Sequence, residues 1–85
     1  MFEVFFSEKA KKDFQILSDE TKKLVSKKLV SFQKNPASVR IRKIVNSKNY
    51  FRLRVGDFRV VFEKEGKLIK IFRIRHRNEI YRKIF

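Results

Sequence analysis

The chain of 85 residues contains no cysteine, one proline, two glycines and a single histidine. Without cysteine it forms neither disulfides nor a thiolate metal site, which fits an intracellular, cytoplasmic protein. No run of apolar residues exceeds three, which excludes a transmembrane helix and the core of a signal peptide. Because no linker composition and no repeat divides the chain, we expect one soluble domain over residues 1–85.

Acidic residues are also scarce: 9 Asp and Glu stand against 23 Lys and Arg, which gives a net charge of +14. A field of this sign attracts polyanions, with nucleic acid first, an acidic protein second and an anionic membrane surface third. The basic residues are sorted by type, because every arginine lies at or after Arg40 while residues 1–39 carry only lysine. Since arginine makes planar, multi-donor contacts to phosphate, we expect the binding surface in the second half of the chain.

The first half of the chain predicts a strand followed by two helices. Residues 2–6 are aromatic and branched and indicate a buried strand. Ser7 can cap a helix that starts directly after it, and Ser18 can cap a second helix that ends before Pro36. A short strand or extended arm over residues 39–45 comes next. Apolar residues at spacings of three and four give each helix an inner stripe: Ala10, Phe14 and Leu17 in the first, and Leu24, Val25, Leu29 and Phe32 in the second.

The segment from Tyr50 to Phe62 alternates strictly and predicts a tight β-hairpin around Gly56-Asp57, a favoured two-residue loop. One side of this hairpin is apolar and the other carries arginines. In the register that the loop sets, Arg54 lies directly opposite Arg59, and Arg52 lies diagonal to it. Because like charges opposite each other destabilise a strand pair, an anionic ligand on the arginine side explains the arrangement.

A last strand is predicted from Leu68 to Arg75, and its register depends on the loop before it. A two-residue turn at Glu65-Gly66 would send two arginines into the core, which is costly when they are unpaired. We therefore predict a three-residue loop that includes the next lysine and pairs Arg59 with Arg73 on the outer side. That register leaves the isoleucines of this strand on the outer side as well: Ile69 and Ile71.

The predicted order of elements is β-α-α-(β)-β-β-β, an α+β fold. The two helices pack on one face of a twisted, mainly antiparallel sheet. We expect the arginines of the hairpin on the opposite face. Lysines on the outer sides of the helices are expected to act mainly as solubilising groups.

With this order, the chain resembles the RelE/ParE toxin superfamily, and more closely its RelE-like branch. The resemblance is carried by the hairpin FRLRVGDFRVVF and the tail RIRHRNEIYRKIF. It implies the toxin of a type II toxin-antitoxin system, a metal-independent endoribonuclease, or mRNA interferase, that inhibits translation by cleaving mRNA, often at the ribosomal A site. The implied partners are mRNA, the ribosome and a cognate antitoxin, with no cofactor, metal or membrane.

The resemblance also assigns catalytic residues. Arg52 and Arg54 stand where RelE has lysines, and they cannot readily exchange protons. Tyr81 is therefore the candidate base, because surrounding arginines would stabilise its phenolate. His76 is a competing base or acid. The resemblance also implies Arg59 and Arg77 in catalysis, and in it Arg75 replaces a glycine usual in the family. As further basic residues of the binding surface, we expect the following to bind RNA: Arg40, Arg42, Lys43, Arg73 and Arg75.

Chemistry and composition keep three functions open. Metal-free RNA cleavage needs a base, an acid and cations around the phosphorane, and the chain supplies the cations. It has no cluster of carboxylates for two magnesium ions, so a metal nuclease is not expected. Two alternatives to the RNase are a ParE-like nonenzymatic toxin that acts on DNA gyrase and a cleavage-dead basic RNA-binding domain. The arginines could also be only a solvated face and Tyr81 an aromatic lid, although Arg77 and Tyr81 together favour the RNase.

Overall fold

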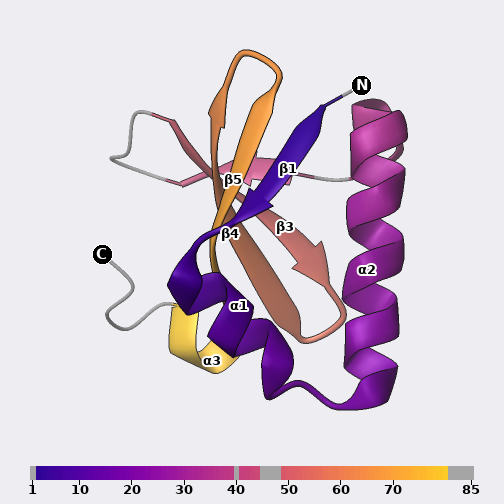
Figure 1. Cartoon of the computed structure of the whole chain (residues 1–85), viewed down its shortest axis with the longest axis vertical. Coiled ribbons are helices and arrows are strands. Elements are labelled where there is room, and N and C mark those ends of the chain that lie inside the picture. The colour runs from indigo at the N-terminus through magenta and orange to yellow at the C-terminus, as the bar shows by residue number, and fades with distance from the viewer. Residues whose placement is uncertain (1, 40, 45–48, 81–85) are drawn as a thin grey trace.

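The computed structural model describes residues 2–39, 41–44 and 49–80. Figure 1 shows two main helices beside a twisted sheet, and no helix within those residue ranges is long and apolar enough to cross a membrane. The order of elements confirms the predicted fold, although the sequence analysis did not anticipate the two short helices, η1 and α3. The elements are β1 (Glu3–Phe6), α1 (Glu8–Gln15), α2 (Asp19–Lys34), the 3-10 helix η1 (Pro36–Ser38), β2 (Ile41–Lys43), β3 (Tyr50–Val55), β4 (Phe58–Glu65), β5 (Leu68–His76) and α3 (Arg77–Ile80).

The sheet has five strands in the order β1-β5-β4-β3-β2. The first strand pairs with the last one in parallel, and every other pair is antiparallel. Strand β5 therefore lies inside the sheet, between β1 and the β3–β4 hairpin (Figure 1). The mainly antiparallel sheet that the alternation predicted is confirmed.

Serine caps start both main helices, as predicted. The Ser7 Oγ accepts a hydrogen bond from the Ala10 backbone N at 3.0 Å and donates one to the Phe72 carbonyl at 2.9 Å. The Ser18 Oγ accepts from the Thr21 backbone N at 3.1 Å. Both contacts satisfy N–H groups that have no partner inside a helix. Ser7 additionally ties the start of α1 to the middle of β5.

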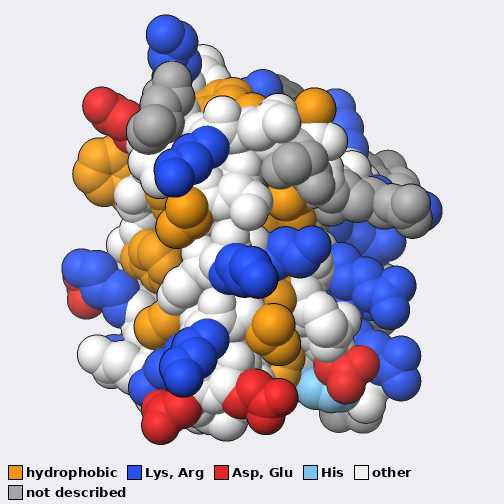
Figure 2. Space-filling view, turned by 90° about the vertical axis from the view of Figure 1, so that its right-hand side faces the viewer, with side chains coloured by type: hydrophobic (Ala, Val, Ile, Leu, Met, Phe, Trp, Pro, Cys, Tyr) orange, Lys and Arg blue, Asp and Glu red, His pale blue; other side chains and the backbone are white. Residues whose placement is uncertain are grey.

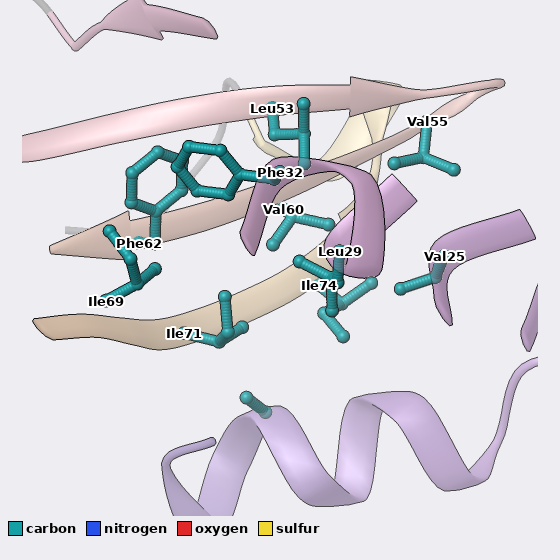
Figure 3. Close-up of a cluster of buried hydrophobic side chains, with 11 residues drawn as sticks. Val25, Leu29, Phe32, Leu53, Val55, Val60, Phe62, Ile69, Ile71 and Ile74 are labelled. Carbon is teal, nitrogen blue, oxygen red and sulfur yellow. The ribbon is translucent and has the colours of Figure 1, made fainter. Parts of the chain in front are cut away.

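The core lies between the sheet and the two helices, as Figure 3 shows. Two residues expected in it lie outside. Phe5 is 55% exposed, because alternate side chains of β1 point away from the helices. Leu24 is 48% exposed, because one residue turns the helix by about 100° from the buried position of Val25. The buried apolar cluster consists of Ala10, Val25, Leu29, Phe32, Leu53, Val55, Val60, Phe62, Ile69, Ile71 and Ile74.

The hairpin of β3 and β4 has the predicted register. Arg54 pairs with Arg59 and Val55 pairs with Phe58, which leaves Gly56 and Asp57 as a two-residue loop. Gly56 has a φ of +58°, a conformation that glycine adopts without strain. The loop thus fixes which side of each strand is apolar.

The hairpin of β4 and β5 differs from the prediction. Its loop is Gly66-Lys67, since Glu65 pairs with Leu68, and Ile69 and Ile71 are completely buried in the core. The predicted three-residue loop and the outer position of these isoleucines are therefore wrong.

A β-bulge reconciles the buried isoleucines with the outer arginines. Phe62 pairs with Ile71 and Val61 pairs with Arg73, so Phe72 is an extra residue in β5. The extra residue changes which side the following residues face, and the ladder then continues on the shifted register. As a result Arg59 pairs with Arg75, and the predicted pairing of Arg59 with Arg73 is wrong. The regular ladder that we predicted could not place the isoleucines of β5 in the core and its arginines on the outer side at the same time.

Candidate functional site

Three arginines stand in register across three neighbouring strands. Arg54 of β3 is the cross-strand partner of Arg59 of β4, which in turn is the partner of Arg75 of β5. Arg42 of β2 is likewise the partner of Arg52 of β3. Because paired residues point to the same side of a sheet, these side chains share the face opposite the apolar cluster and the main helices. We call Arg42, Arg52, Arg54, Arg59 and Arg75 the arginine face.

The guanidinium of Arg59 is held at the end of the hairpin. Its Nη1 donates to the Phe58 carbonyl at 3.2 Å and to the Gly56 carbonyl at 3.5 Å. A guanidinium has five N–H donors, so these two contacts leave further donors of the same group for an anionic ligand. Arg54, across the strand pair, is exposed. The hairpin loop therefore positions one arginine by backbone contacts and presents the other to solvent.

A hollow of about 540 Å³ opens at the edge of this face. Besides arginines, Lys28 of α2 and Gly56 of the hairpin loop line it, and none of the described lining residues is acidic. Figure 2 looks onto the side of the molecule that carries α2 and shows Lys and Arg side chains gathered along its right-hand margin. The arginines that line the hollow are Arg42, Arg52, Arg54 and Arg59.

Lys28 is a residue that sequence reasoning missed, because it was grouped with the solubilising lysines. It lies three residues after Val25 and four before Phe32, which are both buried. Residues at these spacings are neighbours on one helix face, so Lys28 flanks the side of α2 that packs on the sheet. This spacing was the signal that could have identified it.

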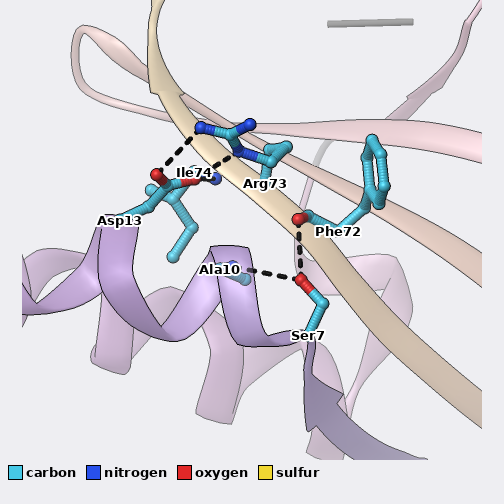
Figure 4. A network of polar contacts seen from close by, with 6 residues as sticks. All are labelled: Ser7, Ala10, Asp13, Phe72, Arg73 and Ile74. Atoms are coloured by element: carbon cyan, nitrogen blue, oxygen red, sulfur yellow. Dashed lines mark hydrogen bonds and ion pairs between the residues drawn. The ribbon is translucent and has the colours of Figure 1, made fainter.

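Arg73 is bound to α1 and is not part of the arginine face. Its Nε donates to Asp13 Oδ2 at 2.8 Å and its Nη2 to Oδ1 at 3.1 Å (Figure 4). The backbone N of Ile74 donates to the same Oδ2 at 3.0 Å. Asp13 is 9% exposed and was not identified from the sequence, where it stands among lysines. The ion pair engages both edges of the carboxylate, so Arg73 serves to join α1 to β5.

Two other candidates face the helix side of the sheet. His76 pairs with Phe58, whose ring it contacts edge-on at a centroid distance of 5.5 Å, and Phe58 packs against the core. Lys43 is exposed and pairs with Phe51, which also packs against the core. Because consecutive strand residues point to opposite faces, neither side chain lies beside the arginine row. The roles of His76 in catalysis and of Lys43 in RNA binding stay predictions.

The remaining candidates lie near or beyond the start of α3. Arg77 is exposed, and its backbone N donates to the Asp57 carbonyl at 2.8 Å. The chain therefore leaves β5 beside the β3–β4 loop. Arg40 and Tyr81 lie outside the described residues. Within the described part of the chain, no three His, Cys, Asp or Glu side chains are grouped so that they could hold a metal ion.

An aromatic pair covers the arginine side of the sheet next to the row. The rings of Tyr50 and Phe72 meet at a centroid distance of 5.7 Å, from strands on either side of β4. Between those strands lies Val61, which has no exposed surface although it faces away from the main core. The bulge supplies Phe72 for this second, smaller apolar layer. Because the bulge was not predicted from the sequence, the layer was not predicted either.

The fold and the arginine face together define a small α+β domain with a cationic sheet surface. A family model described as the ParE toxin of type II toxin-antitoxin system, parDE, matches residues 4–81. Since this match covers nearly the whole chain, the chain belongs to this toxin family.

Individual relatives place it closer to RelE. Toxin RelE3 of Methanocaldococcus jannaschii is 40% identical over 47 residues, and the match spans 55% of this chain but only about half, 53%, of that relative. The RelB-RelE antitoxin-toxin complex from Methanococcus jannaschii matches with a TM-score of 0.78 and 28% identity, over 92% of this chain and 95% of that one. The archaeal RelE-RelB complex from Pyrococcus horikoshii OT3 has the same fold, with a TM-score of 0.76 and 20% identity over 92% and 97% of the two chains. The RelE-like resemblance is confirmed.

Proposed function

We propose that this toxin is a metal-independent endoribonuclease that cleaves mRNA at the ribosome in the cytoplasm. The observation that carries the proposal is the row of Arg54, Arg59 and Arg75, three like charges in register across three strands. Such a row opposes folding, and a bound phosphate offsets the repulsion. Positive charge held in a fixed position is also what a phosphorane transition state requires.

The proposed reaction is attack by a ribose 2′-oxygen on the adjacent phosphorus. The bond from phosphorus to the 5′-oxygen of the next nucleotide breaks, which leaves a 2′,3′-cyclic phosphate and a 5′-hydroxyl. Tyr81 acts as phenolate and takes the proton of the 2′-hydroxyl, and the phenol so formed donates a proton to the leaving 5′-oxygen. The cations around the phosphate are Arg52, Arg54 and Arg59 of the hairpin and Arg77 of α3.

The start of α3 supports this assignment of roles. The contact between the Arg77 backbone N and the Asp57 carbonyl, at 2.8 Å, places the beginning of α3 beside the loop that joins the strands of Arg54 and Arg59. Tyr81 follows α3 directly in the sequence. The β3–β4 loop and the start of α3 thus lie at the same end of the sheet, although β4 and β5 separate them in the sequence.

We further propose a cognate antitoxin as the natural inhibitor. The structural neighbours described above include antitoxin-toxin complexes. A net charge of +14 favours an acidic segment that covers the arginine face and excludes RNA from it. Ile69 and Ile71 cannot contribute apolar contacts to this partner, because both are buried in the core.

The experiment that tests the activity is cleavage of a defined mRNA, with and without ribosomes, in EDTA. We expect cleavage in EDTA, products ending in a 2′,3′-cyclic phosphate, and a stronger reaction with ribosomes. Tyr81→Phe should lower the rate by about 10²-fold while the fold is kept, since general acid-base catalysis contributes about 10²- to 10⁴-fold. Lys67→Ala, in the exposed loop between β4 and β5, is the control for loss of one positive charge and should cleave normally. Loss of activity in EDTA, or full activity in Tyr81→Phe, contradicts the mechanism.

A second candidate is a nonenzymatic toxin that acts on DNA gyrase, since the matching family model is described as ParE. Inhibition of gyrase supercoiling, combined with toxicity and intact RNA, would identify this function. RNA binding without cleavage or toxicity would instead identify a cleavage-dead RNA-binding domain. The three functions thus give different outcomes in one set of assays.

A further inference from the structure

We propose that Lys28 of α2 binds the phosphate next to the scissile one, so that the RNA strand crosses the edge of β3 toward the helix side. The inference rests on the proposed function, because it extends the same interface. It assigns a substrate-positioning role to a helix residue. It also gives the bound strand a path.

The hollow beside the arginine face supplies the main observation. Its lining combines basic side chains of α2, β2, β3 and β4 around about 540 Å³, a volume within the range of ligand pockets. The charged residues among the described lining are all basic, and charges of one sign repel one another and attract an anion. Lys28 is the lining residue that comes from the helical layer. The anion site therefore extends beyond the face of the sheet.

The edge of the sheet explains why the hollow opens at this point. Among the described residues, Ile41–Lys43 of β2 pair with β3 from Leu53 to Phe51. The hollow lies next to this pairing, beside Arg54 and Gly56. A Cβ on Gly56 would meet no atom within 4 Å, so the loop borders open space into which an RNA backbone can enter. An RNA strand bound by Arg54 can therefore pass beside the β3–β4 loop.

The helix surface explains why Lys28, among many lysines, reaches this route. Lys28 flanks the buried stripe of α2, whereas Lys27 lies about 100° further around the helix from Lys28, away from that stripe. A lysine beside an apolar stripe lays its methylene groups along that surface and extends its ammonium to the rim. Lys27 and Lys28 are both exposed, and only Lys28 lines the hollow. The two residues thus form a matched pair for an experiment.

The test compares Lys28→Gln with Lys27→Gln in binding to an oligonucleotide that has 2′-deoxyribose at the cleavage site. Affinity is measured between 50 mM and 200 mM salt, and unfolding of each variant is followed in urea. Each lost phosphate contact on a single strand lowers the slope of log K against log salt by about 0.7. For Lys28→Gln we expect this lower slope and weaker binding. Lys27→Gln should keep slope and affinity near the wild-type values, and Lys28→Arg should restore both.

A ladder of oligonucleotides locates the contact. Extending the RNA by one nucleotide, on the side of the cleavage site whose phosphate Lys28 binds, should increase the affinity of wild type but not that of Lys28→Gln. Equal slopes for Lys28→Gln, Lys27→Gln and wild type overturn the Lys28 site and leave the proposed function standing. If instead Arg54→Ala and Arg59→Ala leave the slope of log K against log salt unchanged while Lys28→Gln changes it, the arginine interface of the proposed function is wrong.

Discussion

The joint between α1 and β5 can be tested by replacing Asp13 with alanine. Asp13 accepts hydrogen bonds from Arg73 Nε at 2.8 Å, Arg73 Nη2 at 3.1 Å and the Ile74 backbone N at 3.0 Å. The side chains of Asp13 and Arg73 are 11% and 20% exposed. The substitution removes the Asp13 carboxylate from a largely buried guanidinium and the acceptor from the buried N–H of Ile74. Both losses destabilise the native state.

The magnitude follows from these exposures. Removing one partner of a buried ion pair costs about 3 to 5 kcal/mol, and we take the lower end because water reaches part of Arg73. The orphaned Ile74 N–H adds about 1 kcal/mol. We therefore expect the free energy of unfolding to fall by about 4 kcal/mol, which lowers the melting temperature by about 15–30 °C in a domain of this size. Asp13→Asn, whose amide oxygen can still accept from Ile74, should lose less.

The assay is urea unfolding of wild type, Asp13→Ala, Arg73→Met and the double variant. Because the double variant no longer buries a guanidinium that has lost the Asp13 carboxylate, we expect it to be more stable than Asp13→Ala alone, with a coupling energy of about 2 kcal/mol. Its RNA affinity should match that of wild type, since Arg73 lies outside the arginine face. Asp13→Ala within about 0.5 kcal/mol of wild type would refute the structural role, because ordinary surface substitutions have effects of that size. Weaker RNA binding by Arg73→Met, equal to that of Arg54→Ala, would refute the exclusion of Arg73 from the interface.

Further substitutions probe the interface, the hairpin loop and the helix caps. Arg54→Ala and Arg59→Ala should each reduce RNA affinity and leave urea stability unchanged or higher, because each relieves repulsion across the strand pair; lower stability with intact affinity would mark these arginines as structural. Gly56→Ala should cost about 1 to 2 kcal/mol by thermal unfolding, all of it from the positive φ, since the space around its Cβ is open; a much larger loss would contradict this account. Ser7→Ala should destabilise more than Ser18→Ala, whose cap is worth about 1 kcal/mol, because only Ser7 also holds the Phe72 carbonyl; equal losses would show that this second contact contributes nothing.

Local signals account for the parts of the fold that the sequence predicted correctly. The serine caps and the alternation around Gly56-Asp57 act over a few residues, so the helix starts and the first hairpin could be read directly. The bulge at Phe72 could not, because alternation in β5 fits either parity until the neighbouring strand is in place. Its position depends on burying Ile69 and Ile71 while keeping Arg75 outside, a tertiary requirement. Phe5 was misplaced for a related reason, since composition does not tell which face of an edge strand is covered.

The candidate site divides along the same line. Arg54 and Arg59 were predicted because a two-residue loop fixes which residues lie opposite each other. Arg75 replaced Arg73 in the row because of the bulge. Lys28 and Asp13 entered the account only when helices were placed against strands, since neither stands in a recognisable motif. Charge patterning thus predicted a cationic surface, and the packing of α1 and α2 against the sheet determined which residues form it.

The inner position of β5 has a consequence for how the protein is made. The strand that separates β1 from β4 comes last in sequence among the described strands, and it carries the partners of both Ser7 and Asp13. Contacts between residues so distant in sequence form late, because a long loop must close first. Until β5 leaves the ribosome, β1 has no strand partner and the arginine row lacks its third member. A chain interrupted before Leu68 should therefore be inactive, because neither the sheet nor the arginine row is complete without β5.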